Sequence, residues 1–276
     1  MKPYNAKPLP PRDPDMCPEG NHYWSYHSLD ALLTCKQPVT ESQDEDLFIA
    51  IHQICELAFH QMILDLERAL DGLAAADRAE AVYFLKRVNK LWRTVNATMP
   101  VLGGLRAFAE FRTSIGPTSG FQSFQFRRLE IMSGVPRYWQ GGTANAEGAV
   151  HVAESEFDKR YGAQVTDWLE RYRHHGLAHY CRQLIDGAGA EDVTVALARL
   201  RQDEATAALF AEFAAYDRHQ LQFHRAHLQL ATRQLQMVGV ETGTGGTSFR
   251  DYLQKYDKTV APLFPGLSAG TDEAEA

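Results

Sequence analysis

The feature of this sequence that most constrains its fold is a long apolar repeat between Asp44 and Leu70. Apolar side chains recur there every three or four residues, at Leu47, Phe48, Ile51, Cys55, Ala58, Phe59, Met62, Ile63, Leu66 and Leu70. This spacing places them on one face of an α-helix. A similar repeat over residues 77–98 predicts a second helix, which we expect to end at Pro100 and the following glycine pair. Long helices therefore dominate the predicted fold.

The other patterned segments also favour helices. They lie at residues 23–34, 105–114, 121–133, 153–185, 191–213 and 214–238. Thr40 followed by Gln43 predicts a capping box before the first long helix. No βαβ alternation and no hairpin signal is present. The predicted fold class is therefore all-α, a helical bundle.

Domain organisation follows from composition along the chain. Residues 1–20 hold six prolines and no periodicity, so we expect an N-terminal arm. Residues 21–266 are expected to form one helical domain. Residues 267–276 are acidic and rich in small side chains, and we expect a disordered tail.

Composition narrows the classes of function. Hydrophobic residues make up 45% of the 276 residues, as in a globular protein with a real core. The formal net charge of -7 argues against nucleic acid as the main partner. With no apolar run of about 18 residues and no signal-peptide pattern, we expect no membrane span and a cytoplasmic location. The four cysteines form no C-x-x-C pair, which argues against zinc or a disulfide framework, and Cys55 is expected to be buried.

Histidine is the residue type that most invites a chemical interpretation, with eleven in the chain. His52 lies within the first long helix, where a lone histidine is most often a satisfied core or boundary residue. His224 and His227 are three residues apart on one predicted helix and could approach one site. The H-E-x-x-H pattern of metalloproteases is absent. A haem iron needs only one axial imidazole, but a packed core would use the same residues.

Two further features allow either a structural or a ligand-binding interpretation. Arg112 follows Phe108 and Phe111 just before a Gly-rich turn, so it could grip a carboxylate or form a surface ion pair. Residues 243–246 (GTGG) could fold over a ligand or be a plain loop. They lack the order of a phosphate-binding loop.

Taken in order, these segments resemble the tryptophan 2,3-dioxygenase family. The resemblance spans residues 23–253. It is carried by residues 23–33 (YWSYHSLDALL), 46–57 (DLFIAIHQICEL), 111–112 (FR), 116–127 (GPTSGFQSFQFR), 217–227 (DRHQLQFHRAH) and 243–248 (GTGGTS). The H-Q-x-x-E-L and S-G-F-Q-S-x-Q-F-R blocks are specific. The resemblance implies a helical oxygenase with one b-type haem (iron protoporphyrin IX) per chain, assembled as a homotetramer.

The resemblance also implies the cofactor side of a site. His227 would be the proximal ligand of the haem iron, with His224 as the alternative ligand. Phe223, Ser119 and Gly120 would lie against the haem. These roles belong to the family pattern and do not follow from spacing alone.

On the substrate side, the resemblance implies L-tryptophan or a close analogue, together with O2. His52 would be the catalytic distal histidine beside the indole nitrogen. Phe48 and Phe108 would line the indole pocket, and Arg112 with Thr244 would bind the substrate carboxylate. Two further substrate-binding residues, from a neighbouring subunit, would be Tyr23 and Tyr26.

The sequence departs from the family pattern around the expected distal pocket and its lid. Ala58 stands where tryptophan is usual, Phe108 where tyrosine is common, and Phe249 where a glycine follows the GTGG loop. The segment between His227 and Gly243 is about three residues longer than usual. These changes leave the reaction open. A dioxygenase would give N-formylkynurenine, and a monooxygenase would put one oxygen atom on an indole or phenol ring. A non-catalytic haem or aromatic-ligand binder, or a cofactor-free helical protein, remain alternatives.

Overall fold

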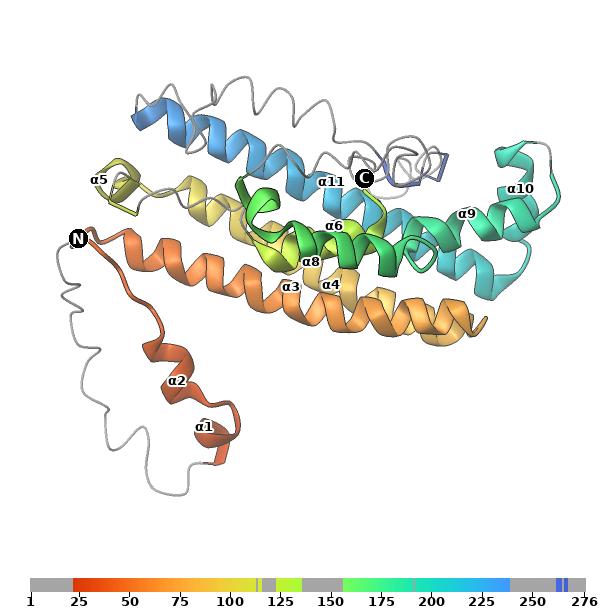
Figure 1. The fold of residues 1–276 in the computed structure, drawn as a ribbon, viewed down its shortest axis with the longest axis horizontal. Coiled ribbons are helices and arrows are strands. Elements are labelled where there is room, and N and C mark those ends of the chain that lie inside the picture. Colours follow the sequence, from red (N-terminus) through yellow and green to blue (C-terminus); the bar gives the residue numbers. More distant parts are fainter. Residues whose placement is uncertain are drawn as a thin grey trace.

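The computed structural model describes residues 22–112, 114–115, 123–135, 156–190, 192–238, 262–264 and 266–267. Every regular element within these ranges is an α-helix, which confirms the predicted all-α class (Figure 1). The helices are α1 (His22–Tyr26), α2 (Leu29–Thr34), α3 (Glu45–Ala74), α4 (Arg78–Gly103), α5 (Phe108–Arg112), α6 (Phe124–Ser133), α8 (Glu156–Tyr172), α9 (Leu177–Gly187), α10 (Val193–Leu200) and α11 (Glu204–Val238). The expected arm before residue 21 and the tail after residue 267 lie outside the described residues.

An antiparallel pair, α3 and α4, forms the base of the bundle (Figure 1). The turn between them is tight because Gly72 lies against the start of α4, where a Cβ atom would meet the Ala81 nitrogen at 3.1 Å. Asp77 caps α4 by accepting a hydrogen bond from the Glu80 amide at 3.0 Å. The apolar repeat of α3 is buried as predicted, and Cys55 is buried with it.

Helix α11 lies parallel to α4 and is held to it by two asparagines. Asn89 Nδ2 donates to the carbonyl oxygen of Glu212 at 3.0 Å, and Asn96 Nδ2 donates to that of His219 at 3.0 Å. The two asparagines are seven residues apart on α4, and their two partners are seven residues apart on α11. Seven residues are about two helical turns, so the same face of each helix contacts the other at two levels. The helix–helix register is therefore fixed by side-chain bonds as well as by packing.

Helices α6, α8 and α9 close the other side of α3 (Figure 1). Glu67 on α3 is the main polar anchor. Its Oε1 accepts hydrogen bonds from Arg128 Nη2 at 2.6 Å, Tyr172 Oη at 2.8 Å and Arg171 Nη2 at 2.9 Å. Because the first two donors come from α6 and the end of α8, one carboxylate ties three helices together.

The short segment 262–267 is docked on α11. The carboxylate of Asp217 accepts from the amides of Leu263 at 2.9 Å and Phe264 at 3.5 Å, and Phe264 stacks on Phe213 with ring centroids 5.2 Å apart. Asp217 is fully buried, and this burial raises the pKa of its carboxyl group. The two amides partly offset that cost because they stabilise the charged form.

Several predicted helix boundaries are wrong. Helix α4 continues through Pro100 to Gly103, since Leu102 packs in the core and its carbonyl accepts from Gln234 on α11 at 3.1 Å. The pattern at 153–185 is split into α8 and α9 by a break at residues 173–176. The patterns at 191–213 and 214–238 divide instead at residues 201–203, so that α11 is one continuous helix.

The predicted capping box of α3 is also wrong. Glu45, at the first position of the helix, binds back to the amides of Val39 at 2.7 Å and Thr40 at 2.8 Å. Asp44 precedes the helix, and its Oδ2 accepts from the amides of Arg106 and Ala107, both at 2.7 Å. The carboxylate of Glu45 binds the backbone that leads into α3, and that of Asp44 binds the backbone that leads into α5. Together they fix the start of α3 against the start of α5.

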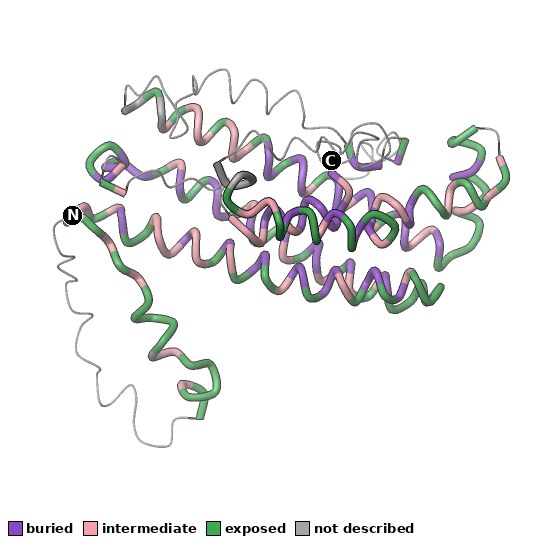
Figure 2. The backbone as a smooth tube through the Cα atoms, in the orientation of Figure 1, coloured by how far each residue is buried: buried purple, intermediate pink, exposed green. Residues whose placement is uncertain are grey.

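Helices α1 and α2 project away from the bundle and are exposed over most of their length (Figure 2). They were predicted as one helix, but Ser28 between them has a left-handed backbone with φ of 51°. Helix α3 exposes a row of apolar side chains, namely Leu47, Ile54, Leu57 and Leu64. By length and composition alone α3 could cross a membrane, with 33% of its apolar stretch buried. Its extensive packing on α4 is that of a core helix.

Candidate functional site

The centre of the candidate site is His52, on the face of α3 that turns toward α5 and α11. Its Nδ1 lies 2.7 Å from the carbonyl oxygen of Phe48, and the Phe48 ring lies 4.2 Å from the imidazole. A carbonyl oxygen only accepts hydrogen bonds, so Nδ1 carries the proton. In the neutral ring, Nε2 is then the free acceptor. Burial lowers the pKa of His52, which favours this neutral form.

An aromatic wall stands beside His52. Phe48 lies 5.3 Å from Phe111 and 6.0 Å from Phe108, and the last two rings lie 5.4 Å apart. Phe108 and Phe111 are buried and belong to α5. Arg112 ends that helix and is partly buried. The structure therefore brings the predicted residues Phe48, His52, Phe108 and Arg112 into one region.

His227 approaches this region from α11. Its ring is parallel to that of Phe223, one turn earlier, at an angle of 3° and a centroid distance of 5.8 Å. Burial first, and then repulsion from His52, lower the pKa of His227 to about 4. The imidazole is therefore neutral at pH 7, the form that binds a metal. The pKa of His227 therefore responds to a charge on His52, which comes from a different helix.

His224 has a different environment, although it is only three residues away. Its Nε2 lies 3.6 Å from Glu130 Oε1 on α6, and Arg127 Nη1 lies 3.8 Å from the other carboxylate oxygen. All three side chains are buried. The imidazole of His224 is therefore already engaged by the carboxylate of Glu130. His227 is therefore better suited than His224 to be a ligand of an iron on the His52 side.

The residues around His227 fit a haem. The family's cofactor needs one neutral imidazole and apolar or aromatic surfaces against the porphyrin. His227 supplies the first, while Phe223 and the wall of Phe48, Phe108 and Phe111 supply the second. Within the described part of the chain, no three histidine, cysteine or acidic side chains gather as ligands of a bare metal ion.

The remaining predicted site residues either lie outside the described residues or belong to the projecting arm. Ser119, Gly120 and Thr244 lie outside the described residues, as does the 243–246 loop. Tyr23 and Tyr26 lie on α1, with 68% and 84% of their surfaces exposed. The ring of His27 lies 4.7 Å from that of Tyr23 and 5.1 Å from that of Tyr26. Helix α1, which carries both tyrosines, projects away from the bundle that contains α3 (Figure 1).

Two features of the region were not predicted. Phe111 was noted in the sequence only as a neighbour of Arg112, yet it is fully buried against Phe48. Gln125 reaches from α6 to Glu56 on α3, with Nε2 at 2.9 Å from Glu56 Oε2. Both lie within the quoted family motifs, but a motif does not say which side chains contact each other.

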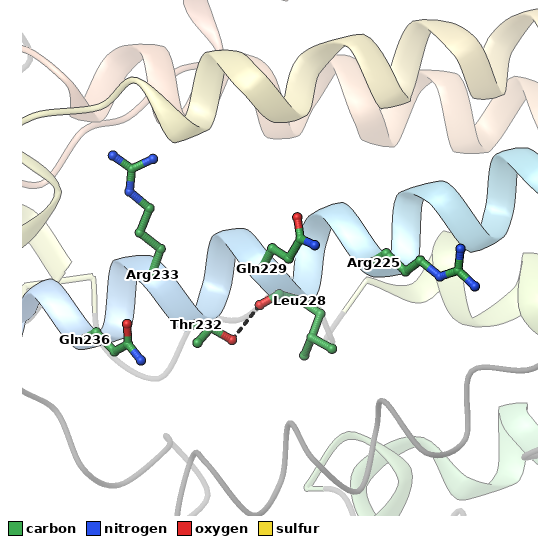
Figure 3. Close-up of a pocket in the computed structure, with 6 residues that line it drawn as sticks. All are labelled: Arg225, Leu228, Gln229, Thr232, Arg233 and Gln236. Atoms are coloured by element: carbon green, nitrogen blue, oxygen red, sulfur yellow. Dashed lines mark hydrogen bonds between the residues drawn. The ribbon is translucent and has the colours of Figure 1, made fainter.

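A hollow of about 480 Å³ lies farther along α11 (Figure 3). It is lined by Arg225, Leu228, Gln229, Thr232, Arg233 and Gln236. All six come from one helix, and Figure 3 shows Arg233 on the opposite side of α11 from Leu228 and Thr232. His52 and the aromatic wall do not line the hollow, although Arg225 and Leu228 flank His227 in the sequence.

The fold and the site define a helical protein with two neutral imidazoles, from different helices, beside an aromatic slot. Comparison with known families gives this class a name. The family model described as tryptophan 2,3-dioxygenase matches residues 12–171. The chain belongs to the tryptophan 2,3-dioxygenase family.

Individual relatives match about nine tenths of the chain. The chain is 32% identical over 261 residues to the tryptophan 2,3-dioxygenase of Anaeromyxobacter sp. (strain K), covering 90% of this chain and 94% of that protein. It is 28% identical to that of Herpetosiphon aurantiacus, over 90% of this chain and 96% of the relative. For the relative from Nocardioides sp. the identity is 29%, over 89% and 92%. The family model and these relatives confirm the resemblance inferred from the motifs.

Proposed function

We propose that this protein is a haem-dependent tryptophan 2,3-dioxygenase, which opens the indole ring of L-tryptophan with O2 to give N-formylkynurenine. The observation that carries the proposal is the pair His52 and His227. Both imidazoles have a lowered pKa and lie close together beside the aromatic wall, in a chain of this family.

His227 is the proposed axial ligand of haem b. Its imidazole is neutral at pH 7, so no proton has to be displaced before the bond to iron forms. The stacked ring of Phe223 restricts the rotation of that imidazole. We expect Ser119 and Gly120 to contact the haem as well. When bound, haem supplies the iron at which O2 is activated.

His52 is the proposed partner of the substrate's indole N–H. Its Nδ1–H is used by the Phe48 carbonyl, so Nε2 is left to accept the indole proton. Phe48 and Phe108 form the apolar slot for the ring. A slot with one polar atom at a fixed place orients an aromatic ligand. This arrangement would hold the indole in one orientation for reaction.

The other end of the substrate is an amino acid zwitterion. We propose that Arg112 pairs with its carboxylate, assisted by Thr244, since a guanidinium offers two parallel donors. We further propose that Tyr23 and Tyr26 complete the site of a neighbouring subunit in a homotetramer. Their exposure on the projecting arm supports this role, since within one chain they have little to pack against.

A monooxygenase that adds one oxygen atom to the ring gains no support from the relatives. Those described above are all named as 2,3-dioxygenases. These relatives match about nine tenths of this chain. We therefore propose the dioxygenase reaction.

The test is the product formed from L-tryptophan under ¹⁸O2 by the haem-reconstituted protein. A dioxygenase gives N-formylkynurenine carrying two ¹⁸O atoms, detected by mass spectrometry. A hydroxylated indole with a single ¹⁸O would overturn the proposal in favour of a monooxygenase. A protein with a Soret band and bound tryptophan but no product would be a binding protein, and one that stays colourless with hemin would have no haem function.

A further inference from the structure

Gln125 connects helix α6 to the helix that carries His52. Its Nε2 donates to two oxygens of Glu56, the backbone carbonyl at 2.7 Å and the side-chain Oε2 at 2.9 Å. Its own carbonyl oxygen lies 2.9 Å from Nδ1 of His60, one turn farther along α3. Both ends of the amide are engaged, so the position of the Glu56 carboxylate is defined from a second helix.

Glu56 lies four residues after His52, on the same face of α3. Side chains with this spacing are neighbours, with about 5–6 Å between their Cβ atoms. Burial is the largest influence on His52 and lowers its pKa. The Phe48 carbonyl and then the charge of Glu56 raise the pKa. The charge of Glu56 therefore opposes the effect of burial, so the pKa of His52 is less depressed than burial alone would make it.

The charges around His52 come from more than one element. Glu56 acts on His52 from the same helix, α3. His227 on α11 and His52 repel each other when both imidazoles are charged. Helix α5 approaches through Phe108 and Phe111, which contact Phe48, and ends in the partly buried Arg112. Among these charged groups, Glu56 is the one that shifts the pKa of His52.

We propose that Glu56 and Gln125 are positioning residues for the reaction: the amide fixes a carboxylate one helical turn from His52, and that charge sets the pH at which Nε2 of His52 becomes available to the substrate. The role of His52 in this statement rests on the function proposed above. The electrostatic link between Glu56 and His52 does not.

The link is tested on the full chain without turnover, by NMR titration of the protein labelled at the histidine ring carbons. The His52 signal is identified by its loss in His52→Gln. In Glu56→Gln, which keeps the size and the acceptor oxygen, we expect His52 to bind protons roughly threefold more weakly, as for one charge about 6 Å away in water. An unchanged titration of His52 would overturn the proposal.

Asp71→Asn is the matched control. It removes the same charge from the same helix, but nineteen residues away, which is about 28 Å at 1.5 Å per residue. This distance exceeds the roughly 8 Å over which charges act at physiological salt. His52 should titrate as in the unaltered protein. A shift as large as that in Glu56→Gln would mean that the effect is one of net charge, against the proposal.

The part played by Gln125 is tested by combining substitutions. Gln125→Leu leaves the charge of Glu56 but frees its carboxylate to turn to solvent, so His52 should shift in the same direction by a smaller amount. Adding Gln125→Leu to Glu56→Gln should change nothing further, because the amide then has no charge to hold. Independent, additive shifts would show that Gln125 does not act through Glu56.

The kinetic test is separate from the titration. In the haem-loaded enzyme, the acid limb of the pH profile of kcat/KM for tryptophan should move to lower pH in Glu56→Gln by the same factor as the NMR titration. A moved titration with an unmoved acid limb would overturn the role in the reaction. A protein that fails to oxidise tryptophan at all refutes the proposed function, and the NMR result then stands or falls independently.

Discussion

At the scale of single residues, the sequence left two candidate iron ligands, and their surroundings distinguish them. His224 and His227 lie three residues apart, and spacing alone allows either to face a cofactor. In the fold, His224 is buried against Glu130, whereas His227 lies near His52. The carboxylate comes from a helix almost a hundred residues earlier, which no local pattern reveals. The family resemblance had favoured His227 because of the motif around it.

Replacing His227 by alanine should abolish the Soret band of hemin-reconstituted protein, because the axial bond to iron is lost. The measurement is an absorption spectrum at matched protein concentration. His224→Ala is the companion variant and should keep the band. An unchanged spectrum in His227→Ala, with loss of the band in His224→Ala, would reverse the assignment.

Arg112→Ala should raise KM for tryptophan by roughly tenfold or more, since a charged hydrogen bond to a carboxylate is worth about 1.5–3 kcal/mol. Steady-state kinetics with the haem-loaded enzyme measures this change. Arg112→Lys should recover only part of the loss, because an ammonium cannot form two parallel bonds. Equal KM values for all three proteins would remove Arg112 from the site.

At the scale of elements, apolar periodicity predicted which segments are helical and much less well where they end. The face of α3 that the sequence marked as apolar is the buried face, and His52 lies at its edge. The end of α4 was predicted at Pro100 and the following glycine pair; the helix passes through Pro100, although proline lacks a backbone donor, and ends at Gly103. Packing of Leu102 outweighs that loss. Such terminal turns depend on partners distant in sequence, as Leu102 depends on Gln234.

The turn after α6 gives a test at this scale. Gly134 has φ of 89°, and a Cβ atom there would lie 2.6 Å from that of Ala178. Gly134→Ala should lower the free energy of unfolding by about 2 kcal/mol or more, from left-handed strain and overlap together. Urea unfolding followed by circular dichroism measures it.

Gly187→Ala is the control for that substitution. Gly187 ends α9, and a Cβ atom there would meet nothing within 4 Å. The alanine should be neutral or slightly stabilising, because it favours the helix. Equal destabilisation by both alanines would show that neither backbone strain nor overlap matters at Gly134.

At the scale of the whole molecule, two buried histidines connect the site to stability. His52 and His227 both have a pKa lowered from the usual 6.5, to about 4 for His227. Below pH 6.5 the unfolded chain takes up protons that the folded chain does not. Folding is therefore weakened as the pH falls toward 4, where the folded His227 also becomes protonated. The site is held at some cost in acid tolerance.

The haem-free protein should therefore lose stability between about pH 6.5 and 4, and His227→Leu should lose less. One group shifted this far accounts for at most about 3 kcal/mol, given 1.36 kcal/mol for each pKa unit. The measurement is urea unfolding at a series of pH values. His22→Gln, on the exposed helix α1, serves as control and should follow the unaltered protein. Identical pH curves for His227→Leu and the unaltered protein would contradict the burial of a neutral His227.

The two asparagines of α4 limit where residues can be inserted into α11 without moving His227. Both bind α11 before it reaches His227, at Glu212 and His219. A single residue inserted between His219 and His227 would swing the imidazole about 100° around the helix axis. Residues added after His227 change nothing upstream of them. We expect the extra length between His227 and Gly243 to fall on that tolerant side, where added residues leave the position of the ligand unchanged.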